Sequence, residues 1–195
     1  MFVLTVLKDT LKILPSDFRK SREEALKDEI NRKYANRVLH DIGLCILAHD
    51  LLEIDEGYVQ HSEGWIWVKV TFRMVVFRPF REEILIGRVR NSNESGIHIS
   101  MVFFDDIVIP KECMPDGCEY DQKEGVWVWH FEGSDFFVDN GELIRFSVVE
   151  STFLDVNPPR PKKREEEENV TATGRPPFSI TGSIAQSGLG LMSWW

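Results

Sequence analysis

Residues Phe77–Pro110 read FRPFREEILIGRVRNSNESGIHISMVFFDDIVIP, and this stretch decides the fold that we expect. Because Pro79 has no backbone N–H to donate to a sheet, the strand that precedes it should end just before it. After Pro79, strands of about five residues alternate with Asn, Ser and Gly, which is typical of a small Greek-key barrel. We therefore place a domain boundary near Arg78 and expect two domains, residues 1–78 and 79–195.

The first domain should hold one helix. Ser21 followed by Glu24 has the spacing of a capping box. Leu26, Ile30 and Tyr34 then recur every four residues, with charges on the opposite face. We expect an amphipathic helix over residues 21–36, lying on a sheet.

Three apolar stretches predict the strands of that sheet. The first covers residues 2–14 and should be broken or bulged near residues 8–10. The second covers 38–54, where Gly43 indicates a bulge or a close backbone approach. The third, Ile66–Phe77, alternates between two faces, with Ile66, Val68, Val70, Phe72, Met74 and Val76 on one and Trp67, Lys69, Thr71 and Arg73 on the other. The first domain is therefore predicted to be α+β, with one helix on a curved antiparallel sheet.

The second domain should be an all-β OB-fold barrel. Residues 157–175 are rich in Pro and then in charge, so we expect a flexible insertion there. Phe178–Ile184 then alternates again as a strand. The five strands that we expect for the barrel are Ile84–Arg90, Gly96–Met101, Asp106–Ile109, Val126–Phe131 and Leu143–Val149.

The net charge of −9 is unevenly distributed. Residues 1–78 balance 12 Lys and Arg against 12 Asp and Glu, whereas residues 79–156 hold 6 against 16. So acidic a module is a poor non-specific binder of polyanions.

Three cysteines without CxxC spacing are typical of a protein from the cytosol or nucleus, and no apolar run is long enough to cross a membrane.

The motifs of common enzyme classes are absent from the sequence. It contains no phosphate-binding loop, no GxSxG and no HExxH. Cys113, Cys118 and His130 lack a fourth zinc ligand at a suitable spacing. Asp105 and Asp106 are adjacent, so in a strand they would point to opposite faces. We expect neither a catalytic site nor a metal or cofactor.

The aromatic residues leave two interpretations open. Alternation places Trp127 and Trp129 on one face of a strand, where they could stack on bases or fill a subunit interface; the acidic neighbours favour the interface. For Phe103 and Phe104, either both rings pack in the core or one of them is exposed and available for stacking. The tail, residues 188–195, is too apolar for a free end, and it either closes the barrel or also contacts a partner.

Several stretches together resemble one family, the larger stalk subunit of eukaryotic RNA polymerase III. This family shares its plan with the stalk subunits of RNA polymerases I and II and of the archaeal enzyme. The resemblance covers essentially the whole chain except the insertion, and the ending GLGLMSWW is its most specific part. The other stretches that carry it are Phe77–Phe80, Glu83–Gly87, His98–Ser100, Phe103–Pro110 and Val126–Trp129.

The resemblance implies a non-catalytic subunit in the nucleus that acts in transcription initiation of genes for transfer RNA, 5S ribosomal RNA and other small RNAs. Its tip domain would dock on the polymerase core, its OB-fold would project outward, and a smaller helical stalk subunit would bind along both domains. Initiation factors and nascent RNA would be further partners. The alternatives are a free OB-fold RNA-binding protein, which the acidic barrel disfavours, and an accessory domain of an enzyme.

Three sets of site residues follow from the strand assignment combined with this resemblance. The set expected to contact RNA is Arg88, Arg90, His98 and Lys111. The set expected to dock on the polymerase core is Pro15, Asp17, Phe18, Gly57 and Gly64. The set expected at the partner interface is Trp127, Trp129, Leu191, Trp194 and Trp195.

Overall fold

The computed structural model describes residues 1–59, 64–131, 133–154 and 176–194. The chain divides into two compact units, Met1–Arg78 and Pro79–Trp195. The described part is mostly β, and its one α-helix lies in the first unit.

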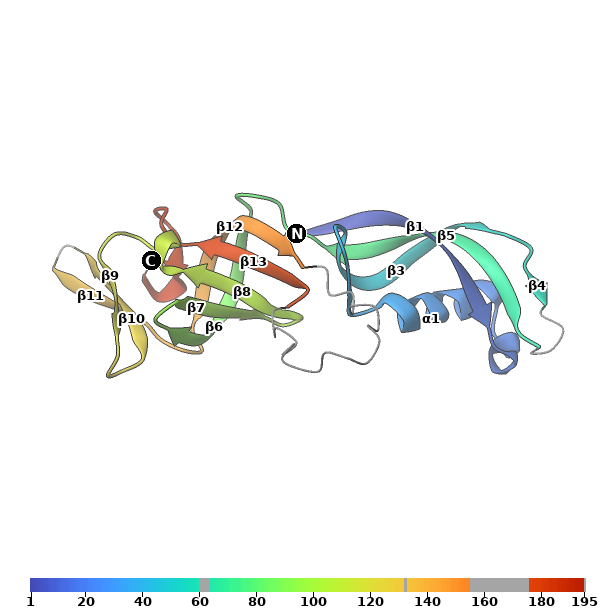
Figure 1. Cartoon of the computed structure of the whole chain (residues 1–195), viewed down its shortest axis with the longest axis horizontal. Coiled ribbons are helices and arrows are strands. Elements are labelled where there is room, and N and C mark those ends of the chain that lie inside the picture. The colour runs from blue at the N-terminus through green and yellow to red at the C-terminus, as the bar shows by residue number, and fades with distance from the viewer. Residues whose placement is uncertain (60–63, 132, 155–175, 195) are drawn as a thin grey trace, which may run out of the picture. The chain divides into compact units, whose positions relative to one another are not determined.

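The first unit is an antiparallel sheet with a helix on one face, as the sequence predicts (Figure 1). The strand order is β1-β5-β3-β2, and the short β4 also pairs with β5. The elements are β1 (Phe2–Ile13), the 3-10 helix η1 (Pro15–Arg19), α1 (Arg22–Tyr34), β2 (Arg37–Leu39), β3 (Gly43–Ile54), β4 (Tyr58–Val59) and β5 (Ile66–Phe77).

Helix α1 begins and packs as the sequence pattern predicts. The hydroxyl of Ser21 accepts a hydrogen bond from the backbone N–H of Glu24. Leu26 and Ile30 are fully buried against the side chains of β5 that alternate toward the helix. The helix ends at Tyr34, two residues earlier than predicted, and Asn36 turns the chain with a φ of 58°.

The predicted break in the first strand is wrong. β1 pairs with β5 residue by residue, from Phe2 opposite Phe77 to Ile13 opposite Ile66, without a register shift. The strand accommodates the polar Asp9 without a bulge. The carboxylate of Asp9 accepts hydrogen bonds from Lys33 (2.5 Å) and Tyr34 (2.6 Å) of the helix. These bonds, with one from the N–H of Thr10, lower the pKa of Asp9 although its partial burial acts to raise it.

The irregularities lie in β3 instead, whose register against β5 shifts three times. At its start, a Cβ on Gly43 would lie 2.5 Å from the carbonyl oxygen of Phe77. The close backbone approach predicted at Gly43 is therefore confirmed, since a side chain there would collide with the neighbouring strand.

The second unit is a closed five-stranded barrel, which confirms the OB-fold prediction. Its strands follow the order β13-β8-β7-β6-β12, β12 pairs back to β13, and β13 runs parallel to β8. The elements are β6 (Ile84–Asn93), β7 (Gly96–Met101), β8 (Phe104–Pro110), η2 (Lys111–Cys113), β12 (Leu143–Phe153), β13 (Phe178–Ser183), β14 (Gly190–Leu191) and η3 (Met192–Trp194).

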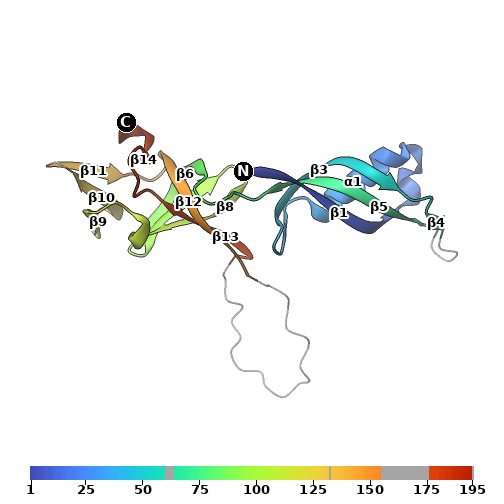
Figure 2. The ribbon, with the colours of Figure 1, turned by 90° about the horizontal axis from the view of Figure 1, so that it is seen from above.

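One strand of the barrel differs from the prediction. Val126–Phe131 is not a barrel strand but β10, the centre of a separate sheet in the order β11-β10-β9. This inserted sheet, with β9 (Cys118–Asp121) and β11 (Ser134–Val138), lies between β8 and β12 in the chain (Figure 2). The fifth barrel strand is β13. The ring of Phe146 packs closely on its Gly182, because a Cβ on Gly182 would lie only 2.8 Å from that ring. The predicted insertion at 157–175 lies outside the described residues.

Candidate functional site

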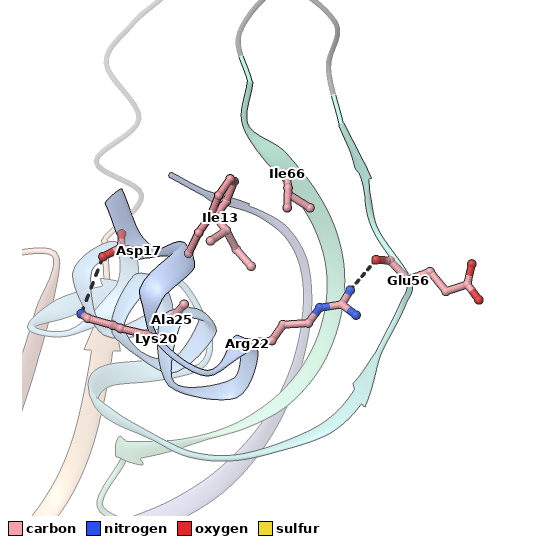
Figure 3. Close-up of a pocket in the computed structure, with 8 residues that line it drawn as sticks. Ile13, Asp17, Lys20, Arg22, Ala25, Glu56 and Ile66 are labelled. Carbon is pink, nitrogen blue, oxygen red and sulfur yellow. Dashed lines mark hydrogen bonds and ion pairs between the residues drawn. The ribbon is translucent and has the colours of Figure 1, made fainter. Parts of the chain in front are cut away.

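At one end of the first unit, a pocket of about 330 Å³ lies between the helix start and two loops (Figure 3). Asp17 and Phe18 of η1 line it on one side, and Glu56 lines it on the other. Phe18 is 49% exposed, which is a large apolar surface for a residue in a short 3-10 helix. Asp17 and Phe18, both predicted to dock, thus lie at the same end of this unit as Glu56, the neighbour of the predicted Gly57, and we call this region the tip pocket.

Arg22 holds the two sides of the tip pocket together. Its guanidinium group donates hydrogen bonds to the carbonyl oxygens of Asp55 and Glu56, the latter at 2.6 Å (Figure 3). Beside it, Lys20 pairs with Asp28 at 2.6 Å and with Asp17 at 3.7 Å. Arginine presents several fixed donors, so one side chain can bind two consecutive carbonyl groups.

Three other residues predicted to dock shape these loops rather than line the tip pocket. Pro15 begins η1, a position where the backbone N–H that proline lacks would have no hydrogen-bond partner within the helix. Gly57 has a φ of 82°, and a Cβ there would lie 2.9 Å from the carbonyl oxygen of Trp67. Gly64 also has a positive φ, 67°, in open space. Both glycines permit turns that other residues adopt only with strain.

The face of the first sheet opposite α1 carries exposed apolar side chains. Leu4 of β1 and Leu47 of β3 both pair with Val75, so the three lie in a row across the sheet. Phe2, Leu4, Val6 and Leu47 are 47–57% exposed. We call these residues the open apolar face; farther along the same face lies the ion pair of Asp50 with Arg73.

On the barrel, three of the four residues predicted to contact RNA share the outer face. Arg88 and Arg90 alternate with buried residues of β6, and His98 lies beside them on β7. Lys111 follows β8 at the far end of this sheet, where Pro110 pairs with Gly96.

The two arginines of this face already have partners. Arg88 donates a hydrogen bond to the carbonyl oxygen of Gly141, and Arg90 lies 3.7 Å from the carboxylate of Asp105. His98 shares a hydrogen bond of 3.1 Å with the amide of Asn93. Burial, with the neighbouring charge of Asp105, raises the pKa of Asp106. Positive charge on this face is therefore partly offset by carboxylates.

The tail packs on the inserted sheet within its own unit. Trp194 lies against Trp129 and Phe136, with ring centroids 5.3 and 5.9 Å apart. The indole N–H of Trp129 donates to the carbonyl oxygen of Asp116 at 3.2 Å. Ser193 also donates to the carboxylate of Glu142 at 2.9 Å. These contacts correspond to the intramolecular alternative for the tail.

Two residues predicted at the partner interface need correction. Trp127 and Leu191 are each 1% exposed, so neither side chain presents a surface to a partner. The indole of Trp127 packs on Tyr120 and donates to the carbonyl oxygen of Asn93, which the sequence pattern could not reveal. Trp195 lies outside the described residues. Trp129 and Trp194 are half-buried and keep part of their rings accessible.

The remaining candidates behave as structural residues. Phe104 is 6% exposed and packs on Phe178, while Phe103 is 37% exposed, so the pair divides between core and surface. Asp105 accepts a hydrogen bond from Ser100.

Within the described ranges, no group of three His, Cys, Asp or Glu side chains could hold a metal ion, and no helix there is long and apolar enough to span a membrane.

Comparison with known proteins covers the entire chain. Residues 83–195 match the family described as RNA polymerase III subunit Rpc25, and residues 8–64 match the SHS2 domain found in the N terminus of Rpb7p, Rpc25p and MJ0397. The chain is 39% identical to DNA-directed RNA polymerase III subunit RPC8 of Bos taurus, over 100% of this chain and 98% of the relative. It is 38% identical to the RPC8 protein of Schizosaccharomyces pombe and 35% to that of Saccharomyces cerevisiae, with both chains covered completely in each case.

Proposed function

The chain belongs to the family of RNA polymerase III subunit Rpc25, and on that premise we propose that it is the larger, non-catalytic stalk subunit of a nuclear RNA polymerase III. Its role is in initiating transcription of genes for transfer RNA, 5S ribosomal RNA and other small RNAs. Similarity over the full length to the RPC8 subunit of RNA polymerase III from three organisms carries this proposal.

The tip pocket supports the proposed docking on the polymerase core. Phe18 offers an exposed aromatic ring, and the hydrogen bonds of Arg22 fix the loop that carries Glu56 and Gly57. Backbone held by hydrogen bonds beside an exposed aromatic ring is a suitable anchor, because less conformational entropy is lost when it binds.

The open apolar face supports the proposed smaller stalk subunit. Four large apolar side chains at about half exposure, together with Val75, form a contiguous surface that water solvates poorly. Helices bury apolar stripes against such faces. We propose that a helix of the smaller subunit covers Leu4, Val6 and Leu47.

The proposal also includes contact with nascent RNA. The outer barrel face presents Arg88, Arg90 and His98 together, but Asp105 and Asp106 lie beside them. Phosphate contacts drive binding to single strands, so this face would bind RNA weakly and with strong salt dependence.

Affinity capture of the full-length tagged chain from its own cells tests the proposal. We expect the subunits of RNA polymerase III to be recovered with it in near-equal amounts. Recovery of RNA without polymerase subunits would favour the alternative, a free OB-fold RNA-binding protein.

A further inference from the structure

A groove of about 350 Å³ opens between the tail and the inserted sheet. Three aromatic residues line it: Trp129 and Phe131 from β10, and Trp194 from η3. Pro115, Leu189 and residues 184–187 complete the lining. We call it the aromatic groove; it is distinct from the tip pocket, the open apolar face and the arginine-bearing face of the barrel.

The rings of the aromatic groove are held in place before any ligand arrives. Trp129 is stacked on Phe131, with centroids 4.8 Å apart, and contacts Trp194 on η3. The N–H of Trp129 is already bound to the carbonyl oxygen of Asp116, so the ring orientation is fixed. Phe131 is nevertheless 46% exposed. Rigid aromatic walls with a partly exposed ring are typical of sites that bind an apolar side chain.

The charge around the aromatic groove selects the class of ligand. The segment 111–139 holds 2 Lys and no Arg against 8 Asp and Glu, but Glu119, Asp121 and Asp135 lie on the face of the inserted sheet away from the groove. Two acidic residues adjoin the groove lining: the carbonyl oxygen of Asp116 accepts from Trp129, and the carboxylate of Glu142 accepts from Ser193. Ala185, Gln186 and Ser187 on the opposite side of the groove are uncharged. An acidic field attracts Lys and Arg and disfavours polyanions such as RNA. Trp rings additionally attract cations at their faces.

We propose that the aromatic groove is a docking site for a basic linear peptide of a partner protein. One large apolar side chain of the peptide sits against Phe131 and Trp194, and Lys or Arg residues beside it face Asp116 and Glu142 at the edge of the groove. This interaction uses neither the tip pocket nor the open apolar face, and it assigns Trp129 and Trp194 of the predicted partner-interface set to the peptide.

Fluorescence anisotropy with the full-length chain tests this site. The probe is a labelled peptide with one Phe between pairs of Lys, and the comparison probes are the same peptide with Glu in place of Lys and a labelled oligouridine. We expect saturable binding of the Lys peptide that weakens as salt rises. We expect Phe131→Ser to weaken it about tenfold or more, as loss of an aromatic anchor does at interfaces.

Two further variants keep the test independent of folding. Phe137→Ser is the matched control: Phe137 is 43% exposed on the same sheet, but it pairs with Val128 on the opposite face, and its loss should leave binding unchanged. Ala185→Arg adds bulk and positive charge to an exposed groove residue, and should weaken binding of the Lys peptide without loss of thermal stability.

Several results would overturn the proposal. Equal binding of the Glu peptide, or tighter binding of oligouridine, would show that the groove does not select basic peptides. Unchanged affinity in both Phe131→Ser and Ala185→Arg would place the peptide elsewhere. If the chain forms a dimer and Phe131→Ser dissociates it, the occupant of the groove is a second copy of the chain. If deleting residues 158–164 greatly increases the affinity for the peptide, the occupant is the chain's own basic segment.

Discussion

The backbone of Gly190 lies directly against the indole ring of Trp194. A Cβ on Gly190 would be 2.5 Å from both Cε3 and Cζ3 of that ring. Gly190 also has a φ of 109°, a conformation in which other residues are strained. This glycine therefore lets the tail fold back so that Trp194 can reach Trp129 on the inserted sheet.

The first prediction tests this packing. Gly190→Ala should destabilise the chain by about 1–3 kcal/mol, through backbone strain and displacement of Trp194. Gly188→Ala is the matched control, because Gly188 has a φ of 83° but no atom within 4 Å of a would-be Cβ. Urea unfolding should show a smaller loss for Gly188→Ala. Equal losses in the two variants would mean that the ring contact adds nothing.

The second prediction concerns pH and the sheet of the first unit. The hydrogen bonds from Arg73 lower the pKa of Asp50 to about 2. Because the folded-state pKa lies below the unfolded value, this contribution to stability is present above about pH 4 and is lost as pH falls toward about 2. Arg73→Gln should therefore lower the urea midpoint at about pH 6.5, and the deficit should shrink by about pH 2.5. A deficit that is constant with pH would exclude Asp50 as its source.

The third prediction concerns the arginine clamp at the tip pocket. Arg22→Ala removes both hydrogen bonds to the loop at Asp55 and Glu56 and should weaken incorporation into the polymerase several-fold, while Arg22→Lys keeps the charge but loses the paired geometry and should be intermediate. The measurement is competition with the tagged wild-type chain for incorporation. Identical incorporation of all three chains would show that the clamp does not position the docking loop.

The fourth prediction concerns the arginine-bearing face of the barrel. Asp105→Asn removes the carboxylate 3.7 Å from Arg90 and should increase photocrosslinking to RNA about two- to threefold at low salt, because the cation is then free for phosphate. Arg88→Glu with Arg90→Glu should reduce the yield, and adding Asp105→Asn to that pair should not restore it. If the crosslinking yield is the same in all of these variants as in the wild type, RNA contacts another surface.

Local patterns predicted most of the elements. The Ser21–Glu24 spacing located the helix start, and the alternation in Ile66–Phe77 correctly identified the side chains that face it. Burial explains this success, because a period of 3.6 or 2 residues reflects which side chains must leave water. The residues predicted to dock at the tip pocket came from the strand assignment combined with the family resemblance.

Pairings between distant segments could not be predicted in the same way. Val126–Phe131 has the pattern of any half-buried strand, and its sequence does not specify whether it pairs in the barrel or in the inserted sheet. Trp127 and Trp129 look equivalent in alternation, yet Trp127 is 1% exposed and packs on Tyr120, whereas Trp129 is only half-buried. The aromatic groove depends on the contact of Trp194 with Trp129, 65 residues apart in the chain.

Quantifying the chain within affinity-purified RNA polymerase III tests the central claim, that this subunit docks on the enzyme through its tip pocket. The variant is Phe18→Asp, and the matched control is Phe137→Asp, since both rings are exposed, at 49% and 43%. We predict that Phe137→Asp is recovered at the wild-type ratio to the largest subunit and that Phe18→Asp falls at least about tenfold, as expected for a charge placed at an aromatic anchor. Recovery of Phe18→Asp at the wild-type ratio would contradict the account.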